Sequence, residues 1–131
     1  MISFTVYKPS GQIIRSGTCQ AELISDQALG ADETVIEEAS DYKTQYMLGG
    51  KLTPRPMQST AIDKSTLTSD GIDRINIAGV PTGANIIAIG TIPRNAQTII
   101  SNYFSTTMPD RYVLKISCFP FVDAVFYVEA I

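Results

Sequence analysis

The sequence of 131 residues contains no histidine, no tryptophan and only two cysteines. Without histidine, the chain lacks the commonest general base, the commonest metal ligand and any Ser-His-Asp triad. Cys19 and Cys118 lie far apart and show neither CxxC nor Cys/His spacing, so they predict no zinc site. We expect two small, buried, reduced side chains, while one long-range disulfide between them stays open at this level.

Positive charge is also scarce, because 10 Lys and Arg against 13 Asp and Glu give a formal charge of -3. Binding to nucleic acid or to an acidic membrane depends on clustered basic residues, so we expect neither partner. No run approaches the roughly 18 apolar residues of a membrane span, and residues 1–4 lack the features of a secretory signal. We therefore expect no membrane insertion.

What the sequence does contain is typical of a folded, mainly β protein. Apolar residues make up 44% and charged residues 18% of the chain, far from the composition of disorder. Over residues 1–56 we expect a β-hairpin module, because apolar residues alternate around turns rich in Gly and Pro. The expected elements are a hairpin over 2–16, a short helix over 19–30 that Gly30 ends, a strand over 33–40 and a hairpin over 44–53.

After Pro56 the pattern changes to short strands separated by turn signals, which predicts an immunoglobulin-like antiparallel β-sandwich over residues 57–131. The expected strands cover residues 59–62, 72–78, 85–92, 98–100, 103–104 and 112–118, and a last strand contains Phe126 and Val128. The apolar run 85–92 predicts a central strand covered on both faces. Residues 98–100 and 103–104 predict a hairpin around Ser101 and Asn102.

Tyr112 is a candidate structural residue of this sandwich. It enters a late strand just after a Pro-Asp turn, in "MPDRY", which resembles the tyrosine corner of immunoglobulin-like domains. Leu114, Ile116 and Cys118 should point inward with Tyr112, since they share its period-two spacing. Antibody domains would add a cysteine pair and a buried tryptophan, so the similarity is to immunoglobulin-like modules in general.

Asp70, Gly71 and Asp73 pose the main question of chemistry. A calcium loop would need further oxygen ligands at alternate positions and a bidentate Glu, and only Ile, Arg and Asn follow. A turn needs less, because Asp bonds its own backbone and Gly accepts the left-handed conformation. We therefore expect a structural turn and no metal or cofactor.

Two further residue pairs could suggest catalysis. Lys64 and Ser65 could form a Ser-Lys dyad, and Glu37 and Glu38 could act as paired carboxylates. Neighbouring residues in an extended chain point to opposite sides, so Glu37 and Glu38 cannot flank one bond and the geometry disfavours the Ser-Lys dyad without excluding it. We expect a protein that is not an enzyme.

Phe119, Pro120 and Phe121 form the candidate contact site. They fall in the predicted loop between the last two strands, where apolar rings would be exposed unless a partner covers them. The other rings of the second half, including Phe104 and Tyr127, could line a binding patch, although core packing is the commoner use of such residues.

Most of the chain resembles small virion proteins of tailed bacteriophages and prophages, found among tail and tail-fibre components. The segments that carry the resemblance are "GQIIRSGTC", "ETVIEEAS", "QYMLGGKLTPRP", "SDGID", "GVPTGANIIAIG", "MPDRYVLKI" and "FPFVDAVFYVEA". The resemblance implies a noncatalytic structural protein with an N-terminal hairpin module and an immunoglobulin-like domain. Where relatives have Gly in the turn before Tyr112, this chain has Asp110.

We accordingly expect a virion subunit of the tail, baseplate or fibre-attachment region, assembled in the cytoplasm of a bacterial host. Its partners would be other virion proteins and further copies of itself. Two-stranded hairpins are barely stable alone, so residues 1–56 need a surface to pack on. We therefore expect this module to be the side that docks to another subunit. The alternatives are a module that binds a host-surface glycan or protein receptor, and a capsid decoration protein.

Overall fold

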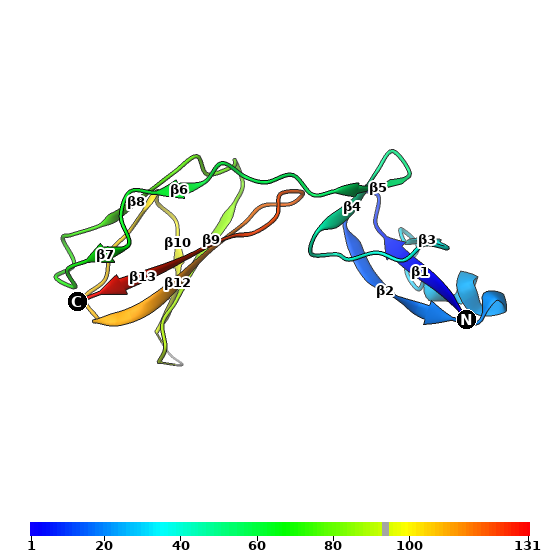
Figure 1. Cartoon of the computed structure of the whole chain (residues 1–131), viewed down its shortest axis with the longest axis horizontal. Helices are drawn as coiled ribbons and strands as arrows, with labels where there is room; N and C mark the ends of the chain where they lie inside the picture. The colour runs from blue at the N-terminus through cyan, green and yellow to red at the C-terminus, as the bar shows by residue number, and fades with distance from the viewer. Residues whose placement is uncertain (93–94) are drawn as a thin grey trace. The chain divides into compact units, whose positions relative to one another are not determined.

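The computed structural model describes residues 1–92 and 95–131 (Figure 1). These residues form two compact units, Met1–Pro56 and Met57–Ile131. The division falls after Pro56, where the sequence analysis sets the domain boundary. All but one of the elements in the described residues are β-strands, which confirms the mainly β class. Within the same residues, no helix is long and apolar enough to span a membrane.

The first unit is built on an antiparallel sheet with the strand order β2-β1-β3. Its strands are β1 (Ile2–Tyr7), β2 (Ile13–Cys19) and β3 (Thr34–Ile36). Phe4, Val6 and Cys19 form a small buried core, as the alternation in the first strand predicts. The strand predicted over residues 33–40 is shorter in the structure, where only β3 belongs to the sheet. Just after β3, the Glu38 carbonyl oxygen accepts a bond from the Thr5 hydroxyl (2.7 Å).

A second hairpin completes this unit, with β4 (Gln45–Leu48) and β5 (Lys51–Pro54) paired as predicted. The Met47 amide donates to the Gly11 carbonyl oxygen (2.8 Å), which joins this hairpin to the turn between β1 and β2. Gly11 has φ 92°, and a Cβ at this position would collide with the Met47 carbonyl oxygen. Only glycine therefore allows the two hairpins to approach so closely.

The predicted helix over 19–30 is only a short 3-10 helix, η1 (Ala21–Gln27), which contains no fully buried residue. The prediction that Gly30 ends it in a left-handed conformation is wrong, since Gly30 has no positive φ and the helix ends before Ala28. The helix is short because its apolar face is weak. Ile24 is the one large side chain of the helix that packs on the core. The Arg15 side chain instead holds the end of the helix by donating to the Gln27 carbonyl oxygen (2.7 Å).

The second unit is a β-sandwich of two sheets (Figure 1). Its strands are β6 (Ala61–Ile62), β7 (Thr66–Leu67), β8 (Ile75–Ala78), β9 (Asn85–Ile89), β10 (Ala96–Ile99), β11 (Tyr103–Phe104), β12 (Asp110–Ser117) and β13 (Ala124–Ala130). One sheet has the order β10-β9-β12-β13-β7 and the other β11-β8-β6. Apart from β7, which runs parallel to β13, all neighbours are antiparallel. With β6, β8 and β11 as strands A, B and E, and β9, β12 and β13 as C, F and G, this is the expected immunoglobulin-like arrangement.

Side chains from both sheets meet in one core. The buried members are Leu67, Ile75, Ile77, Ile86, Ala88, Phe104, Tyr112, Leu114, Ile116, Val128 and Ala130. The inward positions predicted for Tyr112, Leu114 and Ile116 are confirmed. Cys118 was expected with them, but it lies just after β12 and is half-buried. Both cysteines are free thiols, and Cys19 is buried as expected.

The predicted hairpin over residues 98–104 is wrong. The first of its strands, β10, pairs with β9, whereas β11 pairs with β8 in the opposite sheet. The chain crosses between the sheets at Ser101 and Asn102, where the Asn102 carbonyl oxygen accepts a bond from the Ile77 amide (2.8 Å). Tight two-residue hairpins favour residues with positive φ, and neither residue at this crossing has one.

Three other strands of this unit are shorter than predicted, and the one predicted over 59–62 forms only β6. Residues 72–78 form a strand only from Ile75, because a turn occupies the start and leaves Ile72 83% exposed. Residues 85–92 form a strand only to Ile89, and this strand is not covered on both faces. Ile86 and Ala88 are buried, but Ile89 is 45% exposed on the opposite face.

Candidate functional site

Tyr112 is the centre of a hydrogen-bond network at one end of the sandwich. Its ring is 1% exposed and packs edge-on against Phe104, with 4.9 Å between centroids. Its hydroxyl donates to the Met108 carbonyl oxygen (2.8 Å) and accepts a bond from Asn95 Nδ2 (2.8 Å). A phenol that reaches back to the backbone four residues upstream is the geometry of a tyrosine corner.

Asp110 closes the neighbouring loop. Its carboxylate accepts bonds from the Thr91 hydroxyl (2.5 Å) and amide (3.0 Å), from Asn95 Nδ2 (2.8 Å) and from the Arg111 amide (2.7 Å). These bonds, the Thr91 hydroxyl first, lower the pKa of Asp110 to about 2 although partial desolvation opposes them. Asp110, at the start of β12, therefore fastens Thr91 and Asn95, which lie between β9 and β10.

Asp70, Gly71 and Asp73 lie in a turn before β8. One Asp70 oxygen accepts bonds from the Asp73 (2.8 Å) and Ile72 (2.9 Å) amides, and Gly71 has φ 77°. Asp73 accepts bonds from Lys64 Nζ (2.6 Å) and from the Thr68 amide (2.8 Å). These bonds lower the pKa of both carboxyls. No group of three or more His, Cys, Asp or Glu residues in residues 1–92 and 95–131 could hold a metal ion.

The pair Lys64 and Ser65 does not form the interaction that a catalytic dyad needs. Lys64 Nζ is bonded to Asp73, and the Ser65 carbonyl oxygen accepts the Glu129 amide (2.9 Å) beside β13. Glu37 and Glu38 follow β3 in the first unit, where the Glu38 carbonyl oxygen is the acceptor for Thr5. Lys64 thus has a structural partner in Asp73, and the backbone of Glu38 accepts a bond that holds the segment after β3.

Phe119, Pro120 and Phe121 form a turn between β12 and β13, as the sequence places them. The Phe121 amide donates to the Cys118 carbonyl oxygen (2.8 Å) across a cis Phe119-Pro120 bond. Phe119 is 39% exposed, whereas Pro120 and Phe121 are half-buried. One ring of the candidate contact site is therefore presented to solvent to a substantial degree.

A larger apolar surface lies on the outer face of the five-stranded sheet, and the sequence analysis did not single it out. We call it the outer sheet face and define it by the outward residues Ile87, Ile89, Ala96, Thr98, Val113, Lys115, Val125 and Tyr127. Tyr127 is 76% exposed, so this ring is not a core residue. The available signal was that β9 and β13 carry apolar residues at both alternating positions, and that Val113 is an apolar residue at an outward position of β12.

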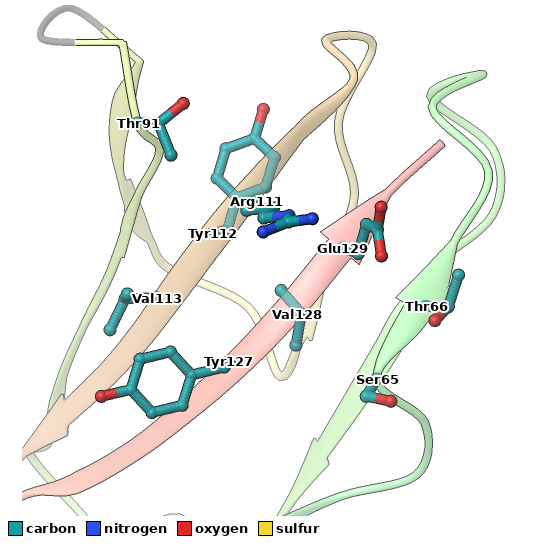
Figure 2. Close-up of a pocket in the computed structure, with 9 residues that line it drawn as sticks. All are labelled: Ser65, Thr66, Thr91, Arg111, Tyr112, Val113, Tyr127, Val128 and Glu129. Carbon is teal, nitrogen blue, oxygen red and sulfur yellow. The ribbon is translucent and has the colours of Figure 1, made fainter.

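A shallow groove of about 520 Å³ runs along one part of the outer sheet face (Figure 2). Figure 2 shows Val113 and Tyr127 toward one end of it, with Arg111 and Glu129 further along the same two strands. Thr91, Ser65 and Thr66 supply hydroxyl groups at its sides. The groove thus has an apolar end at Val113 and Tyr127 and a charged end at Arg111 and Glu129.

Comparison with known proteins gives little that bears on function. No protein-family model and no curated protein matches the chain. Among solved structures, it is similar to a glycosyl hydrolase family 2 member from Bacteroides cellulosilyticus, with a TM-score of 0.36 and 10% identity. The match covers 98% of this chain and 21% of that protein, so the chain spans about a fifth of its length. A likeness this low carries no argument about activity.

Replacing Tyr112 by phenylalanine should lower the free energy of unfolding of the second unit by about 1–2 kcal/mol. The substitution keeps the ring but leaves the Met108 carbonyl and the Asn95 amide without the hydroxyl. Tyr127→Phe is the matched control, and its exposed hydroxyl predicts a change below about 0.5 kcal/mol. Urea denaturation measures both values, and equal effects of the two substitutions would contradict this role of Tyr112.

Proposed function

We propose that this chain is a noncatalytic structural component of a tailed phage virion, in the tail, baseplate or fibre-attachment region. The observation that carries the proposal of a contact role is the outer sheet face, with its contiguous apolar residues around Val113 and Tyr127. Contiguous apolar residues on an exposed sheet face form the kind of surface that a partner or ligand can cover. The sequence resemblance to tail and tail-fibre components supports the virion as the setting.

The electrostatics of the carboxyl groups support a noncatalytic role. A carboxyl that acts as a general acid or base near neutral pH needs a raised pKa. Hydrogen bonds instead lower the pKa of Asp63, Asp70, Asp73 and Asp110, so these groups stay ionised. Their oxygens accept bonds from backbone amides, which stabilises the fold.

The first unit supports docking to other virion proteins. Its β2 is a seven-residue strand at the edge of a sheet, and edge strands offer backbone groups for pairing with another chain. Its buried core is small, comprising Phe4, Val6 and Cys19. In this proposal the protein is assembled in the cytoplasm of the bacterial host and is present in several copies per particle.

Mass spectrometry of purified virions, from the phage or prophage that encodes the chain, tests the proposed location. The protein should be present in a fixed ratio to the other tail proteins, and a map of the particle should place it in the tail, baseplate or fibre-attachment region. Complete absence from virions would end the proposal. A position on the capsid lattice would instead make it a decoration protein.

A second candidate is a module that binds a glycan or protein on the host surface, favoured by the exposure of Phe119 in the loop between β12 and β13. Phe119→Ser should then lower adsorption of virions to host cells by about tenfold while particles still assemble, because aromatic anchors often dominate contact surfaces. Ile72→Ser is a matched control, since it removes an exposed apolar side chain from another loop of the same unit. Unchanged adsorption of the Phe119 variant would exclude this candidate.

A further inference from the structure

Among the described strands of the second unit, β10 forms the longest free sheet edge. The edge strands of its two sheets are β10 and β7 in one and β11 and β6 in the other. The strands β6, β7 and β11 contain two residues each, whereas β10 contains four. A strand at an edge presents unpaired backbone groups to which another chain can bind. The edge at β10 therefore offers the longest row of such groups in this unit.

The pairing of β10 with β9 determines which of its backbone groups are free. The Gly90 amide donates to the Asn95 carbonyl oxygen (2.6 Å), so the backbone of Asn95 faces β9. Along an antiparallel strand, successive residues direct their backbone groups to opposite sides. Gln97 and Ile99 therefore bond to β9. The residues that direct their amide and carbonyl groups to the free side are Ala96, Thr98 and Ile100. In the part of the chain that the structure describes, these groups form no bond to another element.

This edge lacks the features by which proteins usually block the addition of a further strand. Those features are a very short edge strand, charged side chains, proline or a bulge. Residues 95–108 contain no charged residue and no proline. The register of β10 with β9 is regular over all four residues, so no bulge interrupts it. By contrast, the short edge strands β6 and β7 lie on either side of Asp63 and Lys64.

The surroundings of β10 define the chemistry of a strand that would fit beside it. On the outer side, Ile100 is 99% exposed and continues the alternation of Ala96 and Thr98. On the other side, a groove of about 190 Å³ is lined by residues from β10 to just beyond β11, among them the polar Gln97 and Ser105. Because side chains alternate along a strand, one set would lie beside Ile100 and the other in the groove. We expect the first set to be apolar, the second to be small and polar, and neither to be charged.

We propose that β10 binds an extended, uncharged strand of a neighbouring protein, which adds to the five-stranded sheet as a further edge strand. Antiparallel addition centred on Thr98 would form about six hydrogen bonds, since each of the three free residues would exchange two with the added strand. The inference rests on the proposed contact role, which it deepens by naming the kind of partner, but it does not depend on the location in a virion. Absence from virions would end that location and leave strand addition untouched.

Amide hydrogen exchange of the full chain, measured by NMR spectroscopy, tests strand addition. The probe is a synthetic peptide in which Thr alternates with Val and Ile, with a lysine at each end for solubility. The Ala96, Thr98 and Ile100 amides should exchange about tenfold more slowly at a free peptide concentration about ten times the dissociation constant. We expect a dissociation constant on the order of 1 mM, because the contact is small. The Gln97 and Ile99 amides, which already bond to β9, should change less.

Two matched controls separate backbone pairing from other contacts. A peptide with the same side chains, but with N-methyl groups on the amides that would face β10, should not slow the exchange. Thr98→Pro should weaken binding of the unmethylated peptide by about tenfold or more, because it removes a free amide and leaves those bonded to β9 in place. Thr98→Ala keeps this amide and should bind like the wild type. Circular dichroism establishes that each variant is folded, and the methylated peptide on the wild-type protein provides the test if Thr98→Pro is not.

Three results would overturn the inference. The first is unchanged exchange at Ala96, Thr98 and Ile100 with about 10 mM peptide, including the case in which only amides of β2 are protected. The second is equal binding of the methylated and unmethylated peptides, which would show that side chains and not backbone groups make the contact. The third is protection of the same three amides that rises with protein concentration in the absence of peptide, which would assign the edge to a second copy of this chain.

Discussion

The rest of the second unit depends on the burial of one side of β12 between the two sheets. Tyr112, Leu114 and Ile116 alternate along this strand and are almost completely buried, so Arg111, Val113 and Lys115 must point outward. A shift in register by one residue would exchange the two sets and place charged side chains in the core. The pairing of β12 with both β9 and β13 transmits this choice to the neighbouring strands, and it sets the inner core and the outer sheet face together.

The polar residues of this unit stabilise the connections between strands. Tyr112 and Asp110 hold Asn95 just before β10, and Asp70 and Asp73 hold the turn before β8. In the part of the chain that the structure describes, every buried side-chain nitrogen and oxygen has a hydrogen-bond partner. Such groups fix the backbone, and the proposed function rests on the exposed surface.

The elements that the sequence predicts well are those in which one local rule is strong. Alternation identified β12, and turn chemistry identified the hairpin of β4 and β5. The crossing at Ser101 and Asn102 could not be seen in the same way, because it depends on which sheet each short strand joins. The parallel strand β7 was missed because it has only two residues and pairs with β13 far along the chain.

The outer sheet face was missed for a related reason. Its row of Ile89, Val113 and Tyr127 comes from three strands, and only the register brings these residues together. The sequence led to Phe119 in a loop instead, since an exposed ring there needs no knowledge of pairing. The virion setting, the partners and the noncatalytic role stay predictions.

The most direct test of the central claim is NMR spectroscopy of the methyl groups as purified tail proteins of the same virion are added to the full-length protein. The account predicts that signals of Ile87, Ile89, Val113 and Val125 shift on addition of the partner, while those of Ile75, Ile77 and Leu114 in the core stay constant. Shifts confined to methyl groups of the first unit, or no shifts at any residue, would contradict the claim that this protein uses its outer sheet face for contact.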